Sequence, residues 1–166
     1  CVVALSGGVG GAKLALGLAD VLAPGLLHVI ANTADDFSHL GLYISPDIDT
    51  LLYTLAGKSN QELGWGLAGE TWNAMDALQR LGGETWFNLG DKDLALHVER
   101  TRRLRAGERL SDITADIART FGIAARILPA SDHPLRTMVE TDEGVLPFQR
   151  YFVDRRCEPK VQRIRF

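Results

Sequence analysis

The sequence predicts an α/β protein with a Rossmann-like, mostly parallel sheet flanked by helices and a β-hairpin near its C-terminal end. Apolar runs too short for helices alternate with longer segments whose apolar residues recur at helical spacing. A glycine-rich segment joins the first such run to the first helical segment, as it does in a βαβ unit. At about 150 residues per domain, the 166 residues predict one domain over positions 1–166.

The first strand, helix and strand follow from apolar runs and the residues that interrupt them. Residues 1–5 are apolar and end at Ser6-Gly7-Gly8, which predicts a buried strand. Residues 12–22 place leucines and a valine on one helical face, and Pro24-Gly25 ends this helix. Residues 27–31 predict a second buried strand. We expect the two strands to be parallel neighbours in a covered sheet.

A second helix is expected to begin at Ser45-Pro46-Asp47, after a polar stretch over residues 32–39. Ser45 suits the N-cap, Pro46 the first helical position and Asp47 the positive end of the helix dipole. Glycines follow three more helical patterns, and alternating residues around an Asp-Glu-Gly turn predict the hairpin. The expected helices cover residues 70–81, 91–105 and 111–121, and the expected strands cover residues 124–128, 138–140, 145–152 and 161–166.

Composition excludes several classes of protein. The chain has 18 basic and 21 acidic residues, a formal net charge of −3, with 46% hydrophobic and 23% charged residues. This balance excludes a disordered chain and a nucleic-acid binder that acts through bulk charge. No apolar run reaches the length of a membrane span. Because the two cysteines, Cys1 and Cys157, form no C-x-x-C pattern, we expect a cytoplasmic protein without a disulfide framework.

The segment from Ser6 to Lys13 contains four glycines between positions 7 and 11. Glycines at a helix N-terminus let backbone N–H groups approach a phosphate, and Lys13 adds a positive charge. Lys13-Leu14 lacks the hydroxyl of a Walker A loop, and Lys13 replaces the last glycine of a dinucleotide fingerprint. The segment therefore favours a nucleotide phosphate without ATP hydrolysis or hydride transfer; the alternative is a tight strand-to-helix turn.

Four aspartates follow the second predicted strand: Asp35, Asp36, Asp47 and Asp49. Ligands of α/β sheets bind beyond the carboxyl ends of the strands, where these residues meet the glycine segment. Carboxylates that face a phosphate need a cation between them, and Mg²⁺ prefers such hard oxygen ligands. The cluster favours metal-assisted phosphoryl chemistry. For a single aspartate, a structural role at a helix end or turn remains the alternative.

Isolated histidines and clustered tryptophans have structural interpretations as well as functional ones. His39 and His97 each stand alone, and such histidines are more often surface or core residues than catalysts. The arginines of residues 100–105 suit the negative end of a helix. Three tryptophans are expected in the core, although they also suit the lining of a site for a flat heteroaromatic ligand: Trp65, Trp72 and Trp86.

Five segments together resemble the 2-phospho-L-lactate transferase family of coenzyme F-420 biosynthesis, over essentially the whole chain. The most specific are Asn-Thr-x-Asp-Asp and Ser-Pro-Asp-Ile-Asp-Thr, whereas the glycine segment alone is weak. The five segments occupy residues 6–13, 32–37, 44–50, 89–94 and 128–134.

The resemblance implies a magnesium-dependent transferase with a Rossmann-like fold. The donor would be guanosine diphospho-lactate or guanosine diphospho-enolpyruvate, and the acceptor would be Fo, a deazaflavin with a ribityl side chain. The terminal hydroxyl of Fo would attack the phosphorus distal to guanosine, and GMP would leave. Family members are typically homodimers and considerably longer, so residues 1–166 are expected to be the N-terminal part of an enzyme whose later part helps to recognise guanine.

Carried onto this chain, the resemblance assigns roles to individual residues. Asp47 and Asp49 would hold the metal and the acceptor hydroxyl, and Asp36 would support the metal. The nucleotide donor would be held by Ser6, Gly7, Gly8, Gly10, Gly11, Lys13, Asn32 and Thr33. The alternative is a nucleotide-sugar-binding regulator similar to the gluconeogenesis factor, which shares the glycine segment and an acidic segment after the second strand.

Overall fold

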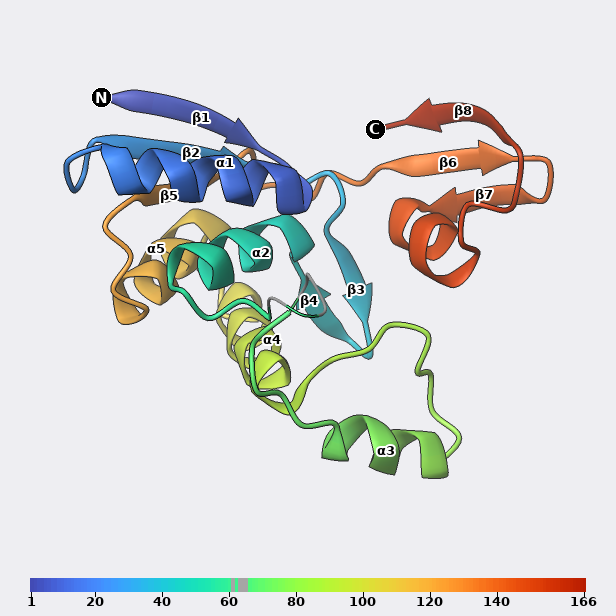
Figure 1. Cartoon of the computed structure of the whole chain (residues 1–166). Helices are drawn as coiled ribbons and strands as arrows, with labels where there is room; N and C mark the ends of the chain where they lie inside the picture. Colours follow the sequence, from blue (N-terminus) through green and yellow to red (C-terminus); the bar gives the residue numbers. More distant parts are fainter. Residues whose placement is uncertain (61, 63–65) are drawn as a thin grey trace.

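The main sheet of the protein is parallel and three-stranded. The computed structural model describes residues 1–60, 62 and 66–166. Strands β1 (Val2–Ser6), β2 (Leu27–Ala31) and β5 (Arg126–Pro129) pair in the order β1-β2-β5 (Figure 1). The predicted parallel pairing of the first two strands is confirmed, with Ser6 opposite Ala31 at their carboxyl ends.

Three helices pack against one face of this sheet: α1 (Gly8–Val21), α2 (Pro46–Leu55) and α5 (Leu110–Thr120) (Figure 1). Alternate strand residues, such as Val29 and Ile127, are buried beneath them. On the other face, Val3 is 59% and Leu5 is 75% exposed. The expectation of a covered sheet therefore holds for one face only in this chain, because all three helices pack on the same side.

A smaller core lies beside the main one. It contains β3 (Phe37–His39) and β4 (Leu42–Ile44), which pair antiparallel, with helices α3 (Asn73–Arg80) and α4 (Asp91–Arg105) nearby. Its buried residues are Phe37, Ile44, Met75 and Leu89. The sequence did not predict this strand pair, because each strand has only three residues and the first contains Ser38 and His39 within a polar stretch.

The C-terminal region forms a separate antiparallel sheet of β6 (Met138–Thr141), β7 (Gly144–Pro147) and β8 (Val161–Arg165), in the order β7-β6-β8. The predicted hairpin and final strand are confirmed. The second hairpin strand is shorter than expected: it ends at Pro147, and a π-helical turn, η1 (Arg150–Asp154), follows. Proline lacks the N–H that a sheet ladder needs, which accounts for the end of the strand.

The observed helix boundaries agree with the predicted ones to within a few residues, and α4 matches at both ends. The exception is α1, which begins at Gly8 where the prediction was residue 12. None of the helices in the described ranges combines the length and apolar character needed to cross a bilayer.

Candidate functional site

A cavity of about 860 Å³ opens beyond the carboxyl ends of β1 and β2, where the fold class predicts a ligand site. One face of α2 forms part of its wall, together with the first turn of α1 and two segments rich in aromatic residues, the second of which includes η1. We call this cavity the crevice. Its lining residues are Gly7, Gly8, Val9, Asn32, Asp35, Ile44, Pro46, Asp47, Asp49, Thr50, Tyr53, Gly66, Thr85, Trp86, Phe87, Asn88, Asp93, His97, Phe148, Gln149, Phe152 and Val153.

The glycine segment forms the start of α1, so its N–H groups belong to a helix N-terminus. Gly8 has a φ of +64°, a conformation that side chains disfavour, and its N–H donates to Asp47 Oδ1 at 2.8 Å. A Cβ on Gly11 would lie 2.4 Å from Ser6 Oγ, whereas one on Gly10 would meet nothing within 4 Å. The glycines therefore serve backbone geometry at Gly8 and close helix–strand packing at Gly11.

Some residues expected to hold the donor lie away from the crevice. Ser6 and Thr33 are buried, and their hydroxyl oxygens have no hydrogen-bond partner among the residues described. Lys13 is exposed in the second turn of α1 and does not line the crevice. Among the expected donor-binding residues, the lining includes Gly7, Gly8 and Asn32.

Two carboxylates that line the crevice, those of Asp35 and Asp47, lie close together. The side-chain nitrogen of Asn32 donates to both, at 2.9 Å to Asp35 Oδ2 and 2.8 Å to Asp47 Oδ2. Burial and the charge of Asp47 raise the pKa of Asp35. Two like charges held this close favour a cation or a proton between them. We call Asp35 and Asp47 the outer pair; the sequence interpretation had not placed Asp35 in its metal set.

Asp36 and Asp49 are buried and bind partners within the protein, although Asp49 also lines the crevice. Asp36 Oδ2 accepts hydrogen bonds from Tyr43 and Ser45, each at 3.0 Å, and burial raises its pKa to about 7. Ser45 is therefore not the expected side-chain cap of α2, because its hydroxyl is used by Asp36. Both terminal nitrogens of Arg100 bind the carboxylate of Asp49.

The expected metal set of Asp36, Asp47 and Asp49 thus divides between two environments. Arg100 is 0% exposed, and although burial lowers its pKa, the charge of Asp49 raises it overall. The positive charge of its guanidinium balances the carboxylates of Asp36 and Asp49, and the same charge repels a metal ion from them. Asp47 faces the crevice with Asp35, and no arginine or lysine in the described ranges forms an ion pair with either.

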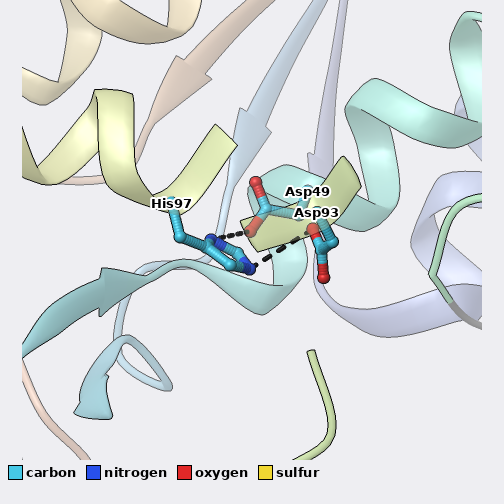
Figure 2. Close-up of side chains that lie close together, drawn as sticks. All are labelled: Asp49, Asp93 and His97. Carbon is cyan, nitrogen blue, oxygen red and sulfur yellow. Dashed lines mark ion pairs between the residues drawn. The ribbon is translucent and has the colours of Figure 1, made fainter. Parts of the chain in front are cut away.

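Asp49, Asp93 and His97 form a second group with the composition of a metal site (Figure 2). His97 Nδ1 lies 3.7 Å from Asp49 and 3.3 Å from Arg100 Nη1, while Nε2 lies 3.3 Å from Asp93 Oδ1. Arginine has only donors, so Nδ1 is the acceptor and Nε2 carries the proton. The two carboxylates face different nitrogens of the His97 ring, and Arg100 already binds the carboxylate of Asp49. This arrangement favours an ion-pair network over a metal site.

Asp93 lines the crevice together with the other two members of this network, Asp49 and His97. Its Oδ1 accepts a hydrogen bond from Tyr53 and contacts the His97 ring. Burial raises the pKa of Asp93, but His97, Tyr53 and Arg100 together lower it overall. The sequence interpretation gives structural roles to His97 and Arg100 and does not place Asp93 in the site, although positions 93, 97 and 100 have the i, i+4, i+7 spacing of one helical face.

Aromatic side chains form the apolar wall of the crevice. Phe148 and Phe152 stack with ring centroids 5.7 Å apart, and the Arg150 guanidinium lies 4.1 Å from the centre of Trp86. Trp86 packs against the smaller core, as predicted, and also lines the crevice, so a role beside a flat ligand stays a prediction. Trp72 immediately precedes α3, and Trp65 lies outside the described residues.

Comparison with known proteins gives consistent matches over nearly the whole chain. The family model "2-phospho-L-lactate transferase CofD" matches residues 2–166. A 2-phospho-L-lactate transferase of Methanosarcina mazei is 39% identical over 161 residues, 97% of this chain and 53% of the relative. A phosphoenolpyruvate transferase of Streptomyces griseus is 40% identical over 168 residues, again 53% of its length. The chain therefore spans about half the length of these relatives.

Solved structures support the fold. Protein BH3568 of Bacillus halodurans has a TM-score of 0.57 at 15% identity, covering 98% of this chain and 49% of that one. A second structure of the same protein, described as a member of the upf0052 family, has a TM-score of 0.54. These similarities establish the Rossmann-like α/β architecture alone, whereas the family match rests on sequence over residues 2–166. The chain belongs to the 2-phospho-L-lactate transferase family.

Proposed function

We propose that this chain carries the reaction centre of a transferase of coenzyme F-420 biosynthesis. The enzyme moves a phospho-lactyl or phosphoenolpyruvyl group from a guanosine diphospho donor to the terminal ribityl hydroxyl of the deazaflavin Fo, and GMP leaves. Membership of the family supports transferase activity. One relative, 39% identical, is named a 2-phospho-L-lactate transferase, and another, 40% identical, is named a phosphoenolpyruvate transferase. Homodimerisation, typical of the family, belongs to the same proposal.

The outer pair is the observation that carries this proposal. Asp35 and Asp47 lie where β2 and the N-terminus of α1 meet, with Asn32 between their carboxylates. A helix N-terminus favours the phosphates of the donor, and carboxylates beside it exclude those phosphates unless a cation intervenes. The site therefore combines anion-binding and cation-binding groups, which is the combination that phosphoryl transfer requires.

Magnesium fits the oxygen ligands of the outer pair. Asp35 and Asp47 would hold it, since the two carboxylates share one amide donor and face the crevice. When bound, the ion neutralises negative charge on the phosphoryl oxygens. Asn32 orients both carboxylates, and the Gly8 N–H fixes Asp47 at the start of α1.

The polar and the aromatic parts of the crevice suit different parts of the two substrates. Its polar end at the outer pair suits the diphosphate of the donor and the hydroxyl of the acceptor. The aromatic wall of Trp86, Phe148 and Phe152 offers flat apolar surface to a deazaflavin ring. Attack in line with the leaving phosphate then needs mainly positioning and charge neutralisation.

The proposal is tested by incubating the protein with Fo, each guanosine diphospho donor and Mg²⁺, and detecting the product by mass spectrometry. Turnover should require magnesium and fall at least about a hundredfold in Asp47→Asn, because that carboxylate faces the reacting groups. Asp76→Asn, on the exposed side of α3, is the matched control and should leave the rate unchanged. Tight binding of a UDP-sugar without Fo turnover would instead support the regulator alternative.

A further inference from the structure

A second, smaller cavity adjoins the crevice at Asp35, which lines both. We call it the side cavity, and its volume is about 220 Å³. Its walls are residues 34–40, 136–138 and 147–150, with Glu84 and Trp86. Pockets for drug-sized ligands have volumes of roughly 300–1,000 Å³, so the side cavity suits one small group of a larger ligand.

Arg136 supplies an unbalanced positive charge to the side cavity. Its side chain is exposed, and it forms no hydrogen bond or ion pair with the part of the chain that the structure describes. The other arginine of this lining, Arg150, pairs with Glu84 at 3.0 Å and with Asp154 at 3.2 Å. The crevice adds no second cation of this kind, because its described lining contains neither arginine nor lysine. An anionic group that enters the side cavity therefore meets the charge of Arg136.

The segment that carries Arg136 is attached to the loop of the outer pair. The Thr137 N–H donates to the carbonyl oxygen of Ala34 at 2.6 Å. The Thr137 side chain also forms a hydrogen bond that opposes the rise in the pKa of Asp35. Arg136 is therefore held one residue from a direct contact of the outer pair.

Both groups that the proposed reaction transfers carry a carboxylate. In phospho-lactate and in phosphoenolpyruvate it is bonded to the carbon that bears the phosphoester oxygen, so it stays close to the reacting phosphorus. The carboxylates of the outer pair repel it, and it therefore needs a positive partner of its own. Arginine fits this need, because its planar guanidinium binds a carboxylate through two parallel hydrogen bonds.

We propose that Arg136 binds the carboxylate of the transferred three-carbon acid, which occupies the side cavity while its phosphate lies at the outer pair. This inference rests on the proposed function and adds a specificity residue for the donor. Two other acidic side chains of the side cavity are already bound, Glu84 by Arg150 and Asp36 by hydroxyl groups of the protein. Arg136 then selects donors that carry an acid over donors that carry a neutral group.

Calorimetric titration with two ligands tests the proposal: guanosine diphospho-lactate and the methyl ester of its carboxyl group, each with Mg²⁺ and without Fo. Wild type should bind the acid at least about tenfold more tightly than the ester, because hydrogen bonds to charged groups are strong. Arg136→Gln should bind the acid at least about tenfold more weakly than wild type does. Its affinity for the ester should stay within about twofold of the wild-type value, since the ester offers no carboxylate to lose.

Two more variants complete the experiment. Arg136→Lys keeps the charge without the planar fork, so its affinity for the acid should lie between those of wild type and Arg136→Gln. Arg80→Gln, at the exposed C-terminal end of α3, is the matched control and should leave both affinities unchanged. Thermal unfolding verifies that each variant is folded, and an exposed side chain such as Arg136 should have little effect on the melting temperature.

The outcomes separate this inference from the proposed function. Equal weakening of acid and ester in Arg136→Gln would overturn the inference, because Arg136 would then act on the diphosphate that both ligands share. Wild type that binds acid and ester equally would overturn it as well, and turnover with Fo would still support the transferase. A preference for the acid that depends on Arg136, without any product from Fo, would overturn the proposed transfer and support the carboxylate site.

Discussion

Arg100→Met should destabilise the protein strongly, because it leaves buried carboxylates without their counter-charge. Arg100 is 0% exposed and binds both oxygens of Asp49, which is itself buried. Removing one partner of a buried ion pair destabilises a protein by about 3–5 kcal/mol. For a domain of 150–250 residues, each kcal/mol corresponds to roughly 2–4 °C. The melting temperature should therefore fall by roughly 6–20 °C.

Thermal unfolding followed by circular dichroism, in EDTA at neutral pH, measures this effect. Arg102→Met is the matched control: it lies on the same helix, pairs with Glu99 and is 64% exposed, so its removal should hardly change the melting temperature. The double variant Arg100→Met/Asp49→Asn should recover part of the loss, because no uncompensated charge remains. A fall no larger than that of Arg102→Met, or no recovery in the double variant, would refute the reasoning.

Three further predictions address packing and ionisation. Gly11→Ala should destabilise by about 1–3 kcal/mol in urea unfolding, because its Cβ would lie 2.4 Å from Ser6 Oγ; Gly10→Ala meets no atom within 4 Å and should be neutral or stabilising. Leu52→Ala should destabilise by about 2–5 kcal/mol, since Leu52 is fully buried; a smaller effect would contradict its place in the core. Asp36 binds its proton more tightly when folded, with a pKa of about 7 against 3.8, so without metal its contribution to stability should fall by roughly 3 kcal/mol as pH rises from 4 to 7. Urea unfolding across this range should show Asp36→Asn gaining stability relative to wild type as pH rises, and a constant difference would count against the shifted pKa.

The sequence predicted the elements whose signals are local. The first βαβ unit followed from apolar runs, and α4 followed from a helical pattern that ends at Gly107. The β3–β4 pair did not, because its three-residue strands depend on packing against residues such as Leu89, distant in sequence. The exposure of one face of the main sheet could not be predicted either, because a short apolar strand sequence does not show whether one or both faces of the sheet are covered.

The candidate site was predicted as a region, whereas the direction of each carboxylate was not. Asp35 and Asp36 are adjacent, yet one faces the crevice and the other Tyr43 and Ser45. Asp47 and Asp49 lie two residues apart on α2, about 200° around the helix, so they also point differently. The spacing of the motif identifies the candidate aspartates. Only the position of Arg100 on α4 shows that the charge of Asp49 is neutralised within the protein.

The side-chain directions of Asp47 and Asp49 depend on each other, because both residues lie on α2. At its first turn, Asp47 accepts from Gly8 and Asn32; one half-turn later, Asp49 is bound by Arg100. Contacts on two sides of the helix oppose its rotation, because any rotation that improves one set breaks the other. A buried ion pair adds little net stability over apolar packing, so the position of Arg100 is better explained by what it holds in place. It anchors α2 from inside while Asn32 sets the spacing of the outer pair, and the crevice keeps two carboxylates available for a cation.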